Sequence, residues 1–255
     1  IPAEAGSCGI IWIKEKTMQQ LSKRLTAVAA LVSSGSRLAD IGTDHAYVPI
    51  RLVQEGRIPG ALAMDVKDGP LTRARDHIRE QGLEQYIQTR KSDGLAALEP
   101  GEADTVLMAG MGGILMIRIL EAGKCHWQQT PEWILQPQSK VGEVRRFVRE
   151  EGFIIAEEDF VEEDGKYYPM MRLIGPGAEQ KTGSCDAGSS GKAGINVGAA
   201  ESWSQVEYAF GKLLLQRHDP VLREFLLKEK AQYAQVRRTV SDKMAEDGST
   251  SLVMY

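Results

Sequence analysis

The stretch "LADIGTDHAYVPIRL", residues 38–52, decides the fold class that this chain is expected to adopt. A short apolar strand runs through Asp40 and is followed by Gly42, as in a nucleotide-binding turn. The two further glycines of the usual dinucleotide fingerprint are missing, and Asp44 and His45 stand in their place. The loop therefore carries a carboxylate where such loops normally accept phosphate.

Short apolar strands alternate with helical segments through much of the chain. Joined by right-handed helical crossovers, such strands form a mostly parallel, doubly wound sheet. An Asp-Gly pair at residues 164–165 predicts that residues 153–174 form a hairpin, which adds antiparallel strands. The sequence thus predicts an α/β fold. Its expected helices are 21–32, 70–82, 114–123 and 140–152, and its expected strands are 37–41, 60–65, 86–94, 104–113 and 132–138.

Composition divides the chain into four segments. Residues 1–17 are expected to be a leader that precedes a native start at Met18, and the α/β domain is expected to span 18–175. Residues 176–202, rich in Gly, Ser, Ala and Lys, read as a flexible linker or loop. Residues 203–255 are expected to form a helical region.

A long amphipathic helix is expected in that last segment. Asp219 is a candidate N-cap, and Pro220 suits the first helical position. Apolar residues recur on one side of the predicted helix, which favours a coiled-coil-like appendage. They are Leu222, Leu226, Tyr233, Val236, Val240 and Met244, and Glu229 interrupts the stripe.

Composition also argues against several classes of protein. The net charge of −4 does not indicate a strongly basic nucleic-acid binder, although a local basic patch would suffice. Cys8, Cys125 and Cys185 lack Cys-x-x-Cys spacing, which indicates reduced thiols in a cytoplasmic protein and no zinc site. The acidic and histidine residues lack His-Glu-x-x-His spacing, so no metal is expected. The apolar run at 9–13 is too short for a membrane span.

Charge discriminates between the candidate cofactors. Asp65 ends the second expected strand, where a carboxylate can accept hydrogen bonds from both ribose hydroxyls of a nucleoside. Asp40 and Asp44 would repel the pyrophosphate of NAD or FAD, by about 1 kcal/mol per charge pair at roughly 4 Å in water. S-adenosylmethionine has no phosphate, and its sulfonium and ammonium groups are cations. The acidic loop therefore predicts S-adenosylmethionine as the cofactor.

Several motifs together resemble the TrmK family, bacterial tRNA methyltransferases that use S-adenosylmethionine to modify N1 of adenine 22. The resemblance implies a Rossmann-like class I methyltransferase fold with a seven-stranded sheet, which would make residues 18–175 the methyltransferase domain. The segment "FGKLLLQRHDPVLREFLLKE" is similar to the start of the family's C-terminal helical region. The other matching motifs, in order, are "LSKRL", "ADIGTDHAYVPI", "DVKDGPL", "SDGL", "AGMGG", "LQPQ" and "EEDGKYY".

The resemblance also implies a set of cofactor contacts. Asp40 and Gly42 would line the methionine end, Asp65 the ribose, and Asp93 with Gly94 the adenine. Further cofactor-binding candidates follow the second and fourth strands: Val66, Ala109, Gly110, Met111 and Gly112.

On the substrate side, the resemblance implies that Asp44 and the turns after the fourth and fifth strands face the base. Adenine N1 is itself a nucleophile, and positive charge spreads into the ring and the exocyclic amine as the methyl group arrives. A carboxylate beside that amine would stabilise the charge and could accept a proton. Asp44 is the first catalytic candidate and His45 the second. Asp44 could equally cap a helix beginning at Ala46.

The base must leave its stack to enter the pocket, and Tyr47 or Met111 could stack on it or belong to the core. Basic side chains on three helices could together grip tRNA, although each could equally be a solvated surface residue. The substrate-binding candidates are Lys23, Arg24, Tyr47, Gln136, Pro137 and Gln138, and the wider basic set adds Lys140, Arg145, Arg146, Arg149, Lys228, Lys230, Arg237 and Arg238.

Two other functions remain open from the sequence. One is a methyltransferase that acts on another RNA or on a small molecule, and the other is a non-catalytic cofactor- or RNA-binding module. No obligate protein partner is expected, and the protein is expected to be a monomer or a weak homodimer.

Overall fold

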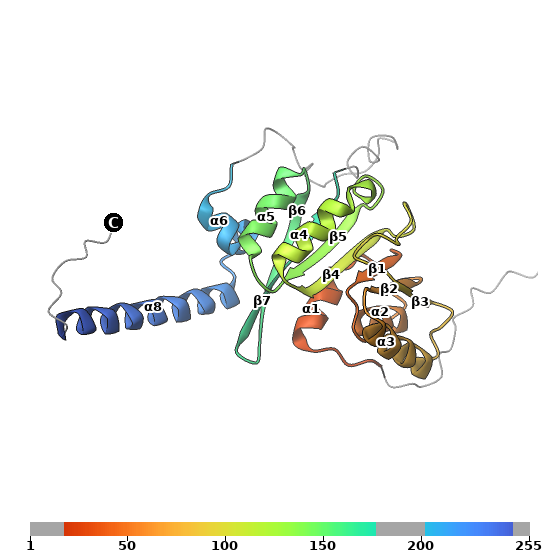
Figure 1. The fold of residues 1–255 in the computed structure, drawn as a ribbon, viewed down its shortest axis with the longest axis horizontal. Helices are drawn as coiled ribbons and strands as arrows, with labels where there is room; N and C mark the ends of the chain where they lie inside the picture. Colours follow the sequence, from red (N-terminus) through yellow and green to blue (C-terminus); the bar gives the residue numbers. More distant parts are fainter. Residues whose placement is uncertain (1–17, 177–201, 247–255) are drawn as a thin grey trace, which may run out of the picture.

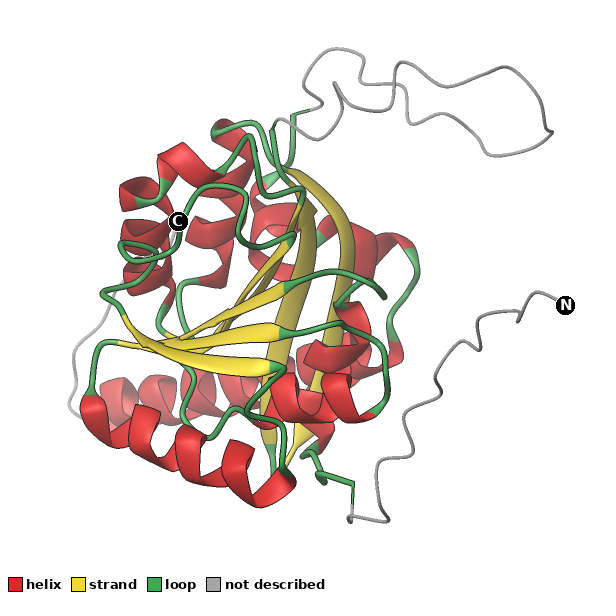
Figure 2. Ribbon diagram, turned by 90° about the vertical axis from the view of Figure 1, so that its right-hand side faces the viewer, coloured by secondary structure: helices red, strands yellow, loops and turns green. Residues whose placement is uncertain are grey.

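The computed structural model describes residues 18–176 and 202–246, and within them a seven-stranded sheet lies between helices (Figures 1 and 2). The strand order is β3-β2-β1-β4-β5-β7-β6. The first five strands pair in parallel, which confirms the predicted doubly wound α/β class. They are β1 (Leu38–Ile41), β2 (Ala61–Asp65), β3 (Ile87–Lys91), β4 (Thr105–Met111) and β5 (Glu132–Pro137).

The predicted hairpin is present as β6 (Ile154–Glu163) and β7 (Lys166–Ile174), and β7 pairs antiparallel to both β5 and β6. Asp164 and Gly165 have φ angles of 52° and 75°, as a tight two-residue turn between antiparallel strands requires. The hairpin therefore completes the seven-stranded sheet with two antiparallel strands.

Helices cover both faces of the sheet because successive residues of the buried strands point in opposite directions. In β4, Leu107 packs into one core, whereas Val106 and Met108 pack into the other. The first core lies under α1 (Lys23–Leu31), α2 (Tyr47–Gln54) and α3 (Asp68–Gln81). The second lies under α4 (Gly113–Ala122) and α5 (Val141–Glu150), and a short 3₁₀ helix, η1 (Lys124–His126), follows α4.

The described part of the C-terminal region, residues 202–246, contains three helices: α6 (Gln205–Phe210), α7 (Lys212–Gln216) and α8 (Pro220–Glu246). The predicted start of α8 is confirmed, because Asp219 Oδ1 accepts hydrogen bonds from the backbone N–H groups of Val221 and Leu222. Leu222 is buried, but α8 then extends away from the sheet, as Figure 1 shows. Much of the predicted apolar stripe, including Tyr233, Val236 and Val240, is therefore exposed.

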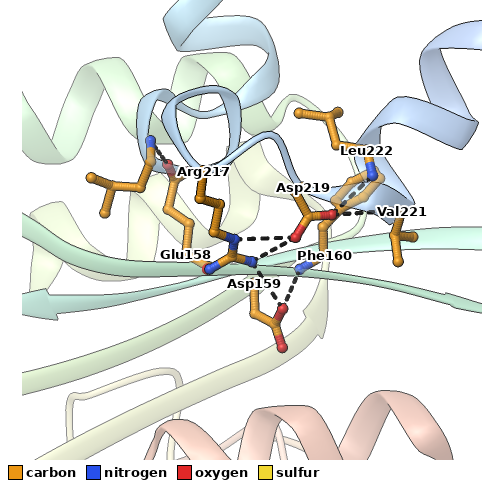
Figure 3. Close-up of polar contacts among 8 residues, drawn as sticks. Glu158, Asp159, Phe160, Arg217, Asp219, Val221 and Leu222 are labelled. Atoms are coloured by element: carbon orange, nitrogen blue, oxygen red, sulfur yellow. Dashed lines mark hydrogen bonds and ion pairs between the residues drawn. The ribbon is translucent and has the colours of Figure 1, made fainter.

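Arg217 attaches the start of α8 to the edge of the sheet (Figure 3). Its Nη1 donates to the backbone oxygen of Glu158 at 2.7 Å. Its Nη2 donates to Asp159 Oδ1 at 3.2 Å and to Asp219 Oδ2 at 2.8 Å. The carboxylate that caps α8 is thus held by the same guanidinium that binds β6.

Arg145 corrects one expectation from the sequence. The sequence places this residue in the wider basic set, yet it is only 1% exposed and its Nε donates to Glu158 Oε1 at 2.7 Å. The reason is that α5 packs beside β6 and α6, so the Arg145 guanidinium binds Glu158 and the backbone oxygens of Tyr208 and Ala209 rather than facing solvent. The other members of the wider basic set on α5 and α8 retain some exposure.

Some expectations lie outside the described residues. These are the leader over 1–17, nearly all of the linker, and the last residues of the C-terminal region from 247 onward. Within the described ranges, none of the helices combines the length and the apolar character needed to cross a membrane.

Candidate active site

A pocket of about 210 Å³ opens at the carboxyl ends of β1 and β4, where the strand order reverses direction. Open α/β sheets bind their ligands at this switch point. Three parts of the chain line the pocket: α1, the segment from the end of β1 through the following loop into the start of α2, and β4. The lining residues are Arg24, Leu25, Asp40, Gly42, Thr43, Asp44, His45, Ala46, Tyr47, Val48, Leu107 and Ala109.

Gly42 makes the sharp turn that forms the floor of this pocket. Its φ angle is +78°, which side-chain-bearing residues rarely adopt, and a Cβ atom there would collide with Met111 Cε. The N–H groups of Gly42 and Thr43 both donate to the backbone oxygen of Met64, at 2.7 and 3.0 Å. The turn is therefore attached to the end of β2, and it brings Met111 of β4 against the loop.

Asp40 is a buried carboxyl at the base of the pocket, with 8% of its surface exposed. Burial raises its pKa to about 6, a hydrogen bond with Thr43 opposes the shift, and the negative charge of Asp65 adds to it. Within the described structure Asp40 forms no ion pair. A cationic ligand would favour the ionised form of this carboxyl, so the residues present fit a ligand with an ammonium or sulfonium group.

Two further carboxylates stand at the same edge of the sheet. Asp65 is half-buried, and its Oδ1 accepts a hydrogen bond from the N–H of Lys67 at 2.7 Å. Asp93 is exposed after β3, and Gly94 follows it with a φ angle of +56°. The structure therefore brings the three predicted cofactor carboxylates to the ends of three adjacent strands. Val66, beside Asp65, is 51% exposed.

Asp93 also lines a second pocket of about 780 Å³, between the loop after β3 and α4. Leu95, Leu115 and Ile119 give this pocket apolar walls near the carboxylate. Such walls suit a flat aromatic ring, and a carboxylate at the rim can accept a hydrogen bond from an exocyclic amine.

On the other side of the first pocket, Arg24 of α1 meets the ends of β4 and β5. Gln136 is completely buried, and its Oε1 accepts hydrogen bonds from Arg24 Nη1 at 2.9 Å and from the Gly110 N–H at 3.1 Å. Gly110 has a φ angle of +81°, which turns the chain at this point. The N–H of Gln138 donates to the Met111 oxygen at 2.8 Å. The amide of Gln136 thus joins α1, β4 and β5.

The remaining substrate-side candidates lie in different places. Pro137 is buried at the end of β5, and Gln138 and Gly112 are exposed beyond the strand ends. Lys23 does not line either of these pockets. It lies near α8, where the pKa of Glu224 is lowered mainly by a hydrogen bond from Lys228 and only slightly further by the charge of Lys23. The side chains of Lys23 and Arg24 therefore lie at different places, although the two residues are adjacent in the sequence.

Asp44 does not cap α2. The helix begins at Tyr47, Ala46 occupies the N-cap position in the left-handed conformation, and the Ala46 N–H donates to Thr43 Oγ1 at 3.2 Å. The Asp44 carboxylate is 59% exposed and instead pairs with Arg73 of α3, whose Nε lies 2.9 Å from Oδ1. The capping interpretation is therefore wrong, and so is the expected helix start at Ala46.

Tyr47 belongs to a stack of three rings at the pocket mouth. Its ring lies parallel to that of His45, with 4.8 Å between centroids and 3° between planes. His77 of α3 lies 4.8 Å from His45 and 5.3 Å from Tyr47. His45 and Tyr47 are thus held together beside Asp44.

Arg73 and His77 were not identified from the sequence. They are four residues apart, so they lie on one face of α3, but this spacing is common on any solvated helix face. Nothing local indicates that this face turns toward residues that lie 29 or more positions earlier in the chain. Parallel packing of β1 and β2 brings the two segments together.

Comparisons with known proteins show which protein family this chain resembles. A family model described as a methyltransferase domain matches residues 21–171. The tRNA (adenine(22)-N(1))-methyltransferase of Bacillus subtilis strain 168 is 40% identical over 152 residues, which cover 60% of this chain. The match spans 64% of that curated relative, slightly less than two thirds of its length.

Two solved structures extend the similarity over most of the chain. Sp1610 from Streptococcus pneumoniae, solved with S-adenosyl-L-methionine, is 33% identical with a TM-score of 0.71, covering 89% of this chain and 97% of that one. TrmK from B. subtilis, an m1A22 tRNA methyltransferase, is 30% identical with a TM-score of 0.69, covering 91% of each chain. This chain therefore belongs to the methyltransferase domain family and, within it, to the TrmK family.

Proposed function

We propose that this protein transfers the methyl group of S-adenosylmethionine to N1 of adenine 22 in tRNA. The names of its relatives from B. subtilis support this reaction and this substrate. The structural observation that carries the proposal is the buried Asp40 carboxyl at the switch point, beside a turn that lacks a phosphate-binding glycine pair. That environment suits a cation and disfavours a pyrophosphate.

S-adenosylmethionine supplies an electrophilic methyl group when it is bound. Asp40 would hold its ammonium group, and Gly42 would let the backbone approach the methionine chain. Asp65 would accept hydrogen bonds from the ribose hydroxyls. Asp93 would accept one from the adenine amine, with Leu95 and Ile119 against the ring.

Asp44 is the proposed catalytic residue because its exposed carboxylate lines the mouth of the same pocket. Placed beside the exocyclic amine of the target adenine, it would stabilise the positive charge that develops there and could accept a proton. His45 lies with its Nε2 3.5 Å from Asp44 Oδ2, so it can support the carboxylate without contacting the base. Arg24, on the opposite wall, would contact the substrate through its guanidinium.

Recognition of the rest of the tRNA would use exposed basic side chains. Arg237 and Arg238 lie on the part of α8 that extends from the sheet, where a backbone phosphate could reach them. Arg146 and Arg149 on α5, with Lys140 directly before the helix, would form a second contact region, whereas the buried Arg145 does not contribute. A tRNA substrate also supports the predicted cytoplasmic location.

The direct test is incubation of the full-length protein with unmodified tRNA and methyl-labelled S-adenosylmethionine, followed by mapping of the modified base. We expect label at N1 of adenine 22 and none in a tRNA in which guanine replaces that adenine. Label at another position or in a small molecule would favour a different substrate. Cofactor binding without transfer to any RNA would favour a non-catalytic module.

A matched pair of variants separates binding from transfer. Asp44→Ala is expected to bind S-adenosylmethionine as the natural protein does and to lose most methyl transfer. Asp40→Ala is expected to lose binding itself, which calorimetry measures. Full turnover by Asp44→Ala would remove Asp44 from the proposed mechanism.

A further inference from the structure

Helix α3 contributes two side chains to the loop that carries the proposed catalytic residue. Arg73 reaches Asp44, and His77, one turn later on the same face, reaches His45 and Tyr47. We infer that Arg73 and His77 are positioning residues for methyl transfer, which act on substrate only through Asp44 and the His45–Tyr47 pair. This inference rests on the proposed function, because it assigns Asp44 to the reaction.

Arg73 fixes one oxygen of the Asp44 carboxylate and leaves the other available. Both Nε, at 2.9 Å, and Nη2 of the guanidinium contact Oδ1. Oδ2 lies 3.5 Å from His45 Nε2 and has no hydrogen bond among the residues that the structure describes. Two hydrogen bonds to Oδ1 restrict rotation of the carboxylate, so Oδ2 keeps a fixed position at the pocket mouth.

His77 acts by ring packing rather than by hydrogen bonding. The Nδ1 atoms of His45 and His77 are both buried, and neither has a hydrogen-bond partner within the described part of the chain. Their rings nevertheless lie 4.8 Å apart, and both stack with Tyr47. The His77 ring of α3 therefore helps to fix the position of His45 and of the loop that continues through Ala46.

The pair between Asp44 and Arg73 is unsuited to a purely structural role. Both side chains are about half exposed, at 59% and 48%, and ion pairs in such positions contribute little to stability. Removing Arg73 should therefore leave the fold intact. The helix also offers a control: Arg79 is exposed, and the ion pair found for it joins it to Asp76 of the same helix.

The test is a double-mutant cycle of Arg73→Ala and Asp44→Ala, with kcat and KM measured for tRNA at saturating S-adenosylmethionine. We expect Arg73→Ala to lower kcat by roughly tenfold with little change in KM, since only the geometry of transfer is altered. In the Asp44→Ala background the same change should have no further effect, because non-additivity marks residues that act as a unit. Arg73→Lys should recover part of kcat, and Arg79→Ala should match the natural protein.

Hydrogen exchange of the cofactor-free protein gives a second readout that needs no turnover. The amides of residues 42–48 should exchange faster in Arg73→Ala and in His77→Ala than in Arg79→Ala. His77→Phe keeps a ring and should restore slow exchange, together with most of the kcat that His77→Ala loses. The inference is overturned by unchanged exchange, by additive losses in the cycle, or by a loss confined to KM, which would indicate a direct tRNA contact.

The two readouts also separate this inference from the proposed function. If the natural protein does not methylate tRNA, the proposed function fails whatever the exchange data show, and the inferred link to transfer fails with it. If the natural protein methylates tRNA and the Arg73 variants match it in exchange and in kcat, the positioning role alone is wrong.

Discussion

Arg145 of α5 and Glu158 of β6 form an ion pair that is almost completely shielded from solvent, with 2.7 Å between Nε and Oε1. The other carboxylate oxygen of Glu158 accepts a hydrogen bond from the N–H of Leu213 at 3.0 Å. Arg145 Nη1 donates to the backbone oxygens of Tyr208 and Ala209. One buried pair thus joins the methyltransferase domain to α6 and α7.

Removal of one partner of this pair should destabilise the protein strongly. Glu158→Gln leaves the Arg145 charge buried without a counter-ion, which typically costs about 3–5 kcal/mol. Burial already lowers the pKa of Arg145, as expected for a cation removed from water. Urea unfolding should therefore show a large decrease in the free energy of unfolding for Glu158→Gln and a smaller decrease for the double variant Arg145→Met/Glu158→Leu. Equal stability of the natural protein and Glu158→Gln would contradict this.

Asp40 should make the cofactor-free protein less stable as the pH rises. Its pKa is about 6 in the folded protein, above the ordinary value of 3.8, so the folded state holds the proton more tightly than the unfolded state. The free energy of unfolding should fall between about pH 4 and pH 6, by roughly 3 kcal/mol if this group acts alone. Asp40→Asn should remove that slope, gain stability at pH 7 and lose cofactor affinity. Thermal unfolding across this pH range measures the first two effects and calorimetry the third.

Gln136 should be needed for the substrate side of the pocket. Gln136→Leu removes the acceptor that holds Arg24 and the Gly110 N–H, so we expect a loss of about 1–3 kcal/mol in stability and a higher KM for tRNA. Gln136→Glu keeps an acceptor oxygen for Arg24 and is the matched control. A Leu variant with unchanged KM would show that Arg24 needs no such support.

The exposed part of α8 should contribute electrostatically to tRNA binding. Arg237→Ala/Arg238→Ala removes two exposed cations, so tRNA affinity should fall and its dependence on salt should weaken, by about one unit of log–log slope for each phosphate no longer neutralised. Affinity for S-adenosylmethionine should not change, because α8 does not line either pocket described above. Binding titrations at several salt concentrations measure both quantities. An unchanged slope would place the tRNA elsewhere.

Local patterns in the sequence were sufficient for the fold. Apolar runs of strand length, helical periodicity and the Asp164–Gly165 turn depend on near neighbours, and they predicted the strands, most of the helices and the antiparallel hairpin. The short helices η1, α6 and α7 were not predicted individually. The cap at Asp219 was also predictable, since capping involves residues only two or three positions away. The replacement of glycines by Asp44 and His45 indicated the cofactor, because the charge of a turn follows directly from the residues that form it.

The partners of individual side chains required the tertiary structure. Asp44 pairs with Arg73 rather than capping α2, and Arg145 is buried rather than exposed, because each contact joins segments that only the sheet brings together. The apolar stripe of α8 gave no indication that Tyr233 and Val236 would remain exposed, since periodicity marks a face but not what packs against it. The sequence alone determined the strands, most of the helices and the charges that the loop carries. The packing of the sheet decided which side chains meet there, since contacts between distant segments depend on strand order and helix orientation.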